Sequence, residues 1–127
     1  MKTAALFVYG TLRRARNGQR HPLLRGARFL QHASMIGALY DLGEYPGVSR
    51  RGRGRVFGEL YELPVDTSPS MLKALDDYEG GEFERRRVVV TLSDGRHRAA
   101  WAYVLRKRPS RARLLSSGRY HAKRGAA

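Results

Sequence analysis

The sequence contains no cysteine, and this absence removes three kinds of chemistry at once. A chain without thiols forms no disulfide bonds, builds no thiolate metal site and has no Cys nucleophile. The four histidines stand at no spacing that is typical of metal ligands: His21, His32, His97 and His121. We therefore expect a protein that binds no metal and uses no cofactor.

Long apolar runs are also lacking. No segment approaches the roughly 20 consecutive apolar residues that a membrane helix requires. The apolar run at residues 4–9 is too short for a signal peptide, and its composition is typical of a strand. These features predict a soluble, cytoplasmic protein with no membrane partner.

Acidic residues are scarce: 11 Asp and Glu face 25 Lys and Arg, which gives a net charge of +14. Basic residues cluster at residues 50–55, 85–87 and 106–127, and the last of these segments contains no acid. One interpretation is a surface for nucleic acid or another phosphate-bearing partner. The alternative is a solvated basic surface, which we favour because no aromatic residues alternate with the arginines as a stacking platform would require.

The 127 residues, 42% of them hydrophobic, suffice for one folded domain. Its patterns predict an α+β fold whose mostly antiparallel sheet could curl into a barrel. A capping hydroxyl, a proline in the first turn and a glycine stop favour one helix at about residues 66–78. A loop is expected at residues 43–47, and strands are expected at residues 4–9, 33–42, 55–63, 85–92 and 98–105.

Two short segments could carry chemistry. A glycine bend at Tyr9-Gly10-Thr11-Leu12 would free backbone N–H groups to bind an anion. The predicted helix ends on Glu79, where the helix C-terminus and partial burial would both raise the pKa of the carboxyl group. Such a group could act as base and then as acid near neutral pH. Taken alone, the first segment is more often a plain turn than an anion site, and Glu79 is more often an exposed residue at a helix end than a catalytic group.

Several motifs together resemble the γ-glutamylcyclotransferase-like superfamily, and in particular its γ-glutamylamine cyclotransferase and avirulence-induced-gene-like branch. The resemblance extends from residue 5 to about residue 105. It rests on the ordered set Val8-Tyr9-Gly10-Thr11-Leu12-Arg13, Leu39-Tyr40-Asp41-Leu42-Gly43-Glu44-Tyr45-Pro46-Gly47, Gly58-Glu59-Leu60-Tyr61, Leu75-Asp76-Asp77-Tyr78-Glu79-Gly80 with Phe83 and Arg85, and Trp101-Ala102-Tyr103-Val104.

The resemblance implies a small, mixed, mostly antiparallel β-barrel with flanking short helices. It also implies that Glu79 is the catalytic acid and base and that the segment from Tyr9 to Leu12 lines the substrate cavity. Tyr45 and Pro46 could form a wall of that cavity or simply a rigid loop, and Arg85 could hold a substrate carboxylate or lie exposed on its strand. The candidate substrate-binding residues are therefore Tyr9, Gly10, Thr11, Leu12, Tyr45, Pro46 and Arg85.

The expected function is that of a cyclotransferase-type lyase. Such an enzyme cyclises a γ-glutamyl amine or peptide to 5-oxoproline and releases the free amine. Two alternatives remain: a catalytically silent family member that binds a small metabolite, and a basic nucleic-acid-binding module. The sequence carries no indication of an oligomeric state.

We expect the family domain to span residues 1–105 and a basic C-terminal tail to span residues 106–127. The tail is either loose or partly packed on the domain. A loose tail could be deleted after about residue 118 without loss of the fold. A packed tail would bury Leu114, Leu115 and Tyr120.

Overall fold

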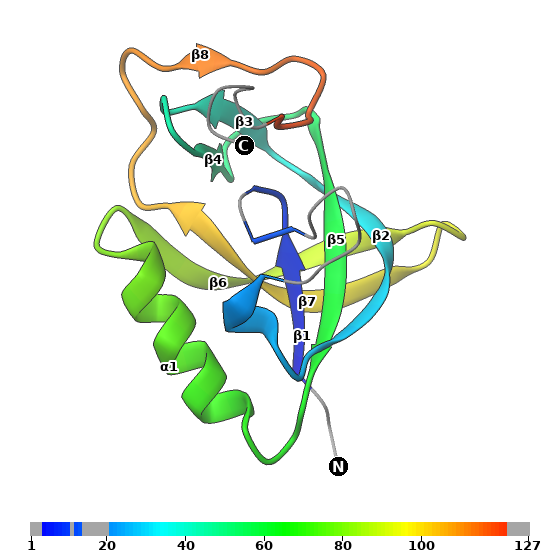
Figure 1. Cartoon of the computed structure of the whole chain (residues 1–127). Coiled ribbons are helices and arrows are strands. Elements are labelled where there is room, and N and C mark those ends of the chain that lie inside the picture. Colours follow the sequence, from blue (N-terminus) through cyan, green and yellow to red (C-terminus); the bar gives the residue numbers. More distant parts are fainter. Residues whose placement is uncertain (1–3, 11, 14–20, 122–127) are drawn as a thin grey trace.

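The computed structural model describes residues 4–10, 12–13 and 21–121. In this part of the chain, strands close into a barrel in the order β1-β5-β2-β6-β7 (Figure 1). Each neighbouring pair is antiparallel except for β1 and β7, whose parallel pairing closes the barrel. The predicted mixed, mostly antiparallel barrel is thus confirmed. Its strands are β1 (Ala4–Val8), β2 (Arg28–Ile36), β5 (Arg55–Leu63), β6 (Phe83–Leu92) and β7 (His97–Leu105).

The apolar character of β1 follows from burial on both of its faces. Successive side chains of a strand point to opposite faces of the sheet. Ala5 and Phe7 therefore join the apolar cluster inside the barrel. Leu6 and Val8 join a second cluster, which lies between the outer face of the barrel and the helix. A strand that is buried on both sides needs an almost continuous apolar run, and β1 has one.

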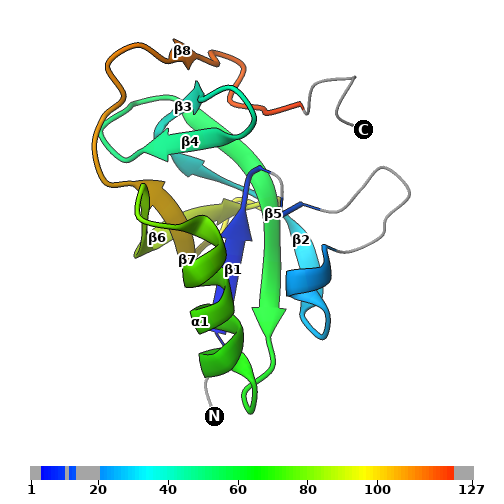
Figure 2. The same ribbon diagram turned by 60° about the vertical axis from the view of Figure 1, so that its left-hand side comes forward.

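The single α-helix of the described part is α1 (Ser68–Glu79), which follows a short 3-10 turn, η1 (Pro22–Leu24), in chain order. It lies against the barrel (Figure 2), and its buried residues Leu72 and Leu75 make the contact. Proline occupies its first turn as predicted, but Thr67 at the N-cap makes no side-chain capping hydrogen bond, so the expected hydroxyl cap is wrong. Neither helical segment has the length and hydropathy that a membrane crossing requires.

The predicted strand at residues 33–42 is wrong as a single element. Gly37 interrupts it, and the Gly37 N–H donates to the Gly54 carbonyl oxygen at 2.9 Å. The chain continues as β3 (Ala38–Asp41), which pairs with β4 (Pro46–Ser49) and with β8 (Arg113–Leu114) in a second, three-stranded antiparallel sheet. Part of the predicted loop at residues 43–47 is therefore the start of β4.

The C-terminal segment packs on this second sheet. Tyr120 is only 5% exposed and belongs to the apolar cluster inside the barrel. The Leu115 N–H donates to the Leu39 carbonyl oxygen at 2.8 Å, and the Leu115 side chain packs against the same cluster. Leu114 stays 53% exposed. The packing of residues 113–120 therefore favours a tail that is partly packed on the domain over a loose one.

Gly118 allows the segment to cross β5 at close range. Its φ of 70° lies in the left-handed region, and a Cβ atom at this position would lie 1.8 Å from the Arg55 carbonyl oxygen. The Gly118 carbonyl oxygen accepts a hydrogen bond from the Phe57 N–H at 2.9 Å. Glycine at residue 118 is thus required by backbone conformation and by contact.

Candidate active site

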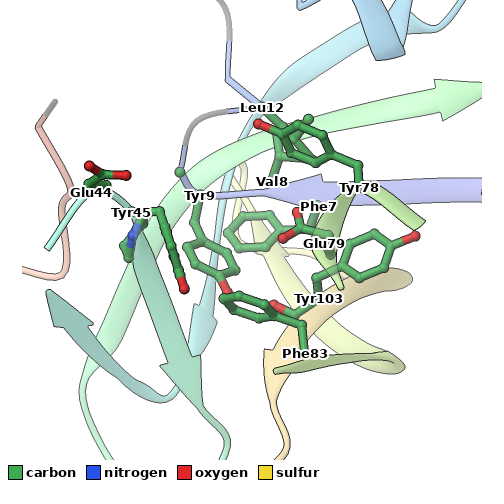
Figure 3. Close-up of a pocket in the computed structure, with 12 residues that line it drawn as sticks. Phe7, Val8, Tyr9, Leu12, Glu44, Tyr45, Tyr78, Glu79, Phe83 and Tyr103 are labelled. Atoms are coloured by element: carbon green, nitrogen blue, oxygen red, sulfur yellow. The ribbon is translucent and has the colours of Figure 1, made fainter. Parts of the chain in front are cut away.

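A cavity of about 500 Å³ lies where β1 ends, between the C-terminus of α1 and the loop that joins β3 to β4 (Figure 3). Its volume falls within the roughly 300–1,000 Å³ that is usual for small-molecule sites. The residues that line it are mostly aromatic or apolar, with two carboxylates: Phe7, Val8, Tyr9, Gly10, Leu12, Glu44, Tyr45, Pro46, Tyr78, Glu79, Phe83 and Tyr103.

Glu79 enters the cavity because of its place on the helix. Residues three and four apart share one helix face, so Glu79 follows the buried Leu72 and Leu75. Gly80, with a φ of 77°, ends the helix directly after it, and its N–H donates to the Asp76 carbonyl oxygen at 3.2 Å. Figure 3 shows the carboxylate pointing inward, toward the ring of Phe7.

Burial raises the pKa of Glu79 from its ordinary value of 4.5 to about 7. Within the described residues, no hydrogen bond or ion pair to the carboxylate opposes this effect. Both protonation states of Glu79 are therefore populated near neutral pH. A carboxyl group of this kind can accept a proton and later return it.

Asp76 lies one helical turn before Glu79 and behaves differently. Its carboxylate accepts hydrogen bonds from the Tyr103 hydroxyl at 2.6 Å and from Arg85 Nε at 3.0 Å. Burial by itself raises the pKa of Asp76, but these two hydrogen bonds outweigh burial and lower it. The helix thus carries two carboxyl groups with different pKa values: Asp76 is held as the anion, and Glu79 has a raised pKa. Such a difference is typical of sites where one carboxylate is structural and the other transfers protons.

Arg85 lies behind the cavity wall. Its guanidinium forms the ion pair with Asp76, and its Cζ atom lies 4.5 Å from the ring centroid of Trp101. It is not among the residues that line the cavity. Arg85 therefore fixes Asp76, which in turn holds the hydroxyl of the lining residue Tyr103.

Tyr9 connects three elements at the base of the cavity. Its hydroxyl donates to the Tyr103 carbonyl oxygen at 2.6 Å and accepts from the Val48 N–H at 3.2 Å. Burial raises the pKa of Tyr9 well above its ordinary value of 10.0, so the hydroxyl stays protonated. With both of these bonds formed, Tyr9 serves as a fixed wall.

The turn after β1 approaches β4 closely at Gly10. A Cβ atom on Gly10 would lie 2.7 Å from Pro46 Cγ, so a larger residue would push the turn away from the cavity. The Arg13 N–H donates to the Gly10 carbonyl oxygen at 3.1 Å and closes the turn. Leu12 is buried and lines the cavity. Thr11, the remaining predicted residue of this turn, lies outside the described residues.

Tyr45 stands on the side of the cavity that faces away from α1. It is 38% exposed, and its hydroxyl donates to Glu82 Oε1 at 2.5 Å. Its ring centroid lies 6.0 Å from that of Phe83, so the loop before β4 is tethered to the start of β6. Glu44 lies beside Tyr45 (Figure 3), and no Lys, Arg or His occurs among the described lining residues.

Six of the predicted site residues therefore meet at one cavity, and Arg85 does not reach it. The six are Glu79, Tyr9, Gly10, Leu12, Tyr45 and Pro46. All but Phe7 of the lining residues that were not predicted belong to the motifs that carry the family resemblance, and that was the available signal for them. Six further lining residues were not predicted: Phe7, Val8, Glu44, Tyr78, Phe83 and Tyr103.

Within the described residues, no three His, Asp or Glu side chains form a group that could hold a metal ion. The cavity carboxylates Glu44 and Glu79 lie on opposite sides in Figure 3. The arrangement is suited to proton transfer on a small molecule bound in the cavity.

Comparison with known proteins connects this chain to a family. Residues 6–122 match the family model described as gamma-glutamyl cyclotransferase, AIG2-like. A Vibrio cholerae protein named "Putative gamma-glutamylcyclotransferase" is 33% identical over 121 residues, which cover 89% of this chain and 91% of that protein.

Two further proteins are similar. The Niallia circulans "Gamma-L-glutamyl-butirosin B gamma-glutamyl cyclotransferase" is 38% identical over 106 residues, which cover 78% of this chain and 65% of that protein. The crystal structure of an AIG2-like protein from Mus musculus superimposes with a TM-score of 0.73 at 24% identity, over 95% of this chain and 90% of that one. This last likeness concerns the fold alone.

Proposed function

Since this chain belongs to the gamma-glutamyl cyclotransferase, AIG2-like family, we propose that it is a cyclotransferase-type lyase acting on a γ-glutamyl amine or peptide. The reaction closes the γ-glutamyl group into 5-oxoproline and releases the free amine. The substrate supplies its own nucleophile, so the protein has to provide proton transfer, charge stabilisation and a folded substrate geometry.

The position of Glu79 is the observation that carries this proposal. A carboxyl group with a pKa of about 7 in this cavity can remove a proton from the substrate α-ammonium. The freed nitrogen then attacks the γ-carbonyl carbon and forms the new C–N bond. The ring nitrogen then loses one of its two remaining hydrogens as a proton. The bond to the leaving nitrogen breaks, Glu79 donates its proton to that nitrogen, and the second proton makes the released amine an ammonium. No water enters, and the products together contain all the atoms of the substrate.

The cavity walls would lower the barrier by holding the substrate folded. An intramolecular attack in a well-oriented geometry lowers the barrier by up to roughly 7–11 kcal/mol. We assign the wall role to Tyr9, Tyr45 and Pro46, which line the cavity from two directions.

Backbone N–H groups in the turn after β1 would bind the negative charge of the reaction. The turn at Gly10 and Leu12 lines the cavity, and preorganised N–H donors stabilise a developing oxyanion. The described lining carries Glu44 and no basic side chain, which favours a leaving amine that is positively charged.

Glu79→Gln tests the proposal. The amide keeps the shape of the side chain but accepts no proton, so 5-oxoproline release from a γ-glutamyl amide should fall about 10²–10⁴-fold in kcat. The substrate KM and the circular dichroism spectrum should change little. The assay uses the full chain and a panel of γ-glutamyl amines and dipeptides, with 5-oxoproline measured directly.

Asp77→Asn is the matched control. Asp77 is an exposed carboxylate of the same helix whose nearest cation is Lys73 at 3.9 Å, so its loss should leave kcat unchanged. Wild-type activity in Glu79→Gln would contradict the catalytic assignment. Binding of γ-glutamyl compounds by the wild-type protein without any turnover would instead support the silent family member.

A further inference from the structure

A second hollow, of about 390 Å³, lies beside the three-stranded sheet. Three segments build it: residues 37–40, residues 49–55 and the C-terminal segment at residues 108–118. Figures 1 and 2 both show β3, β4 and β8 gathered at one end of the molecule, away from the body of α1. The polar side chains of its lining include Arg51, Arg53, Arg55, Arg108, Ser49 and Ser116.

The four arginines of this lining have no acidic partner. All 11 acidic residues of the chain lie in its described part, and none of them lines the hollow. Among the described residues, none of the four forms an ion pair, and Arg55 Nη1 donates instead to the Ser34 hydroxyl at 2.8 Å. Six other arginines of this part of the chain do form ion pairs: Arg28, Arg85, Arg86, Arg96, Arg106 and Arg113. The hollow therefore concentrates positive charge that the protein itself leaves uncompensated.

The backbone beneath these arginines is held in place. A Cβ atom on Gly52 would lie 2.4 Å from the Ala38 nitrogen, so only glycine lets the loop pack this closely on β3. Gly54 accepts the hydrogen bond from Gly37 on the other side. Arg51 and Arg53 flank Gly52, and both are thus carried on a fixed stretch of chain. A site that is ordered before binding loses less entropy when a ligand arrives.

We propose that this hollow binds a small phosphate-bearing ligand, at a site separate from the cavity around Glu79. Guanidinium groups bind phosphate through paired N–H donors, and several of them around one concave surface suit a ligand with more than one phosphate. Ser49 and Ser116 also line the hollow, and the Ser49 hydroxyl accepts a hydrogen bond from the Arg51 N–H at 3.4 Å. A duplex nucleic acid would require an extended basic stripe, whereas these charges meet at one hollow. The assignment does not depend on the proposed enzymatic activity.

Titration calorimetry on the full chain at low salt tests this site, with inorganic pyrophosphate and ATP as probes. The variant Arg51→Gln/Arg53→Gln/Arg108→Gln should bind both probes at least about tenfold more weakly than the wild-type protein, because it removes charged hydrogen bonds. Pyrophosphate should also raise the Tm of the wild-type protein and not that of the variant. Tighter binding of ATP than of pyrophosphate would identify a nucleoside phosphate, and equal binding would identify a free phosphate compound.

The matched control is Arg25→Gln/Arg87→Gln/Arg98→Gln. It removes the same charge at residues outside the hollow that form no ion pair with a described residue, and it should keep wild-type affinity for both probes. Glu79→Gln should keep that affinity as well. If the control variant bound both probes as weakly as the first variant, the affinity would depend on net charge alone, and the proposal would be overturned. Binding of a single-stranded oligonucleotide without binding of pyrophosphate or ATP would overturn it in favour of a nucleic-acid surface.

Discussion

At the scale of single residues, the burial of Glu79 has two opposing effects: it supplies the proposed base and it lowers the stability of the folded protein at high pH. It occupies the helix face that also carries Leu72 and Leu75, so it is drawn out of water when α1 packs. That burial raises its pKa to about 7 and disfavours its anion. The same side chain therefore lowers the stability of the folded protein at high pH while it supplies the proposed base.

The pH dependence of stability should reveal this effect. A carboxyl group with a higher pKa in the folded state binds more protons there, so the free energy of unfolding falls as pH rises between the unfolded pKa near 4.5 and the folded pKa near 7. From pH 4 to pH 8 the wild-type protein should lose about 1–3 kcal/mol relative to Glu79→Gln. Urea unfolding of both proteins at the two pH values measures the difference.

Activity should change in the opposite direction over the same range. The proposed base has to be ionised, so kcat/KM for a γ-glutamyl amide should rise with pH through a limb near pH 7. A difference in stability between wild type and Glu79→Gln that does not vary with pH would show that Glu79 titrates normally.

At the scale of elements, the ion pair of Asp76 with Arg85 ties α1 to β6, and the hydrogen bond from Tyr103 ties it to β7. Arg85→Met should reduce the free energy of unfolding by about 1 kcal/mol, a modest loss because both partners are partly exposed. The KM for a γ-glutamyl amide should change less than about twofold, because Arg85 does not line the cavity. Urea unfolding and initial-rate kinetics measure the two quantities.

Arg86→Met is the control for Arg85→Met. Arg86 lies on the same strand, and its side chain is 48% exposed against 27% for Arg85, so stability and KM should both stay near wild-type values. A tenfold rise in KM for Arg85→Met with unchanged stability would restore Arg85 as a group that holds the substrate carboxylate.

The elements also show which parts of the structure the sequence could predict. The strand at residues 55–63 and the helix near residues 66–78 have strong local patterns, and both were predicted within about two residues. β4 and β8 were not predicted because they are short, and β4 begins with Pro-Gly, which is typical of a loop. Their strand character comes from pairing with β3, which is a tertiary property.

The candidate site, too, could be predicted from the sequence only in part. Helical spacing is local, so the sequence could indicate that Glu79 follows the buried face of α1. The orientation of Arg85 depends on Asp76 and Trp101, which come from other elements, and no local pattern encodes that choice. The hollow around Arg51 and Arg108 was visible in the sequence only as separate basic clusters.

At the scale of the whole molecule, Tyr120 links the C-terminal segment to both loops that frame the cavity. Its hydroxyl donates to the Glu44 carbonyl oxygen at 3.0 Å, and its own carbonyl oxygen accepts from Arg13. Tyr120→Ala should reduce the free energy of unfolding by about 2–4 kcal/mol, since it removes a buried ring. Tyr120→Phe should lose only about 1 kcal/mol, the value of one hydrogen bond. Urea unfolding measures both variants.

Leu114→Ala serves as the control for these variants. Leu114 belongs to the same segment but is 53% exposed, so the change in stability should stay within about 0.5 kcal/mol. If Tyr120→Ala were as stable as the wild-type protein, the segment would contribute no packing energy in solution, and the loose-tail interpretation would return.

The links made by Tyr120 also determine when the cavity can form during synthesis. Arg13 and Glu44 lie 107 and 76 positions before the residue that holds them. A chain emerging from the ribosome folds from its N-terminus, and contacts between distant positions form last. The two loops therefore leave the ribosome long before their shared partner. On a nascent chain that stops short of residue 120, the barrel strands can be present while the contacts of Tyr120 with the two loops are still missing. The proposed activity therefore becomes available only after residue 120 has left the ribosome.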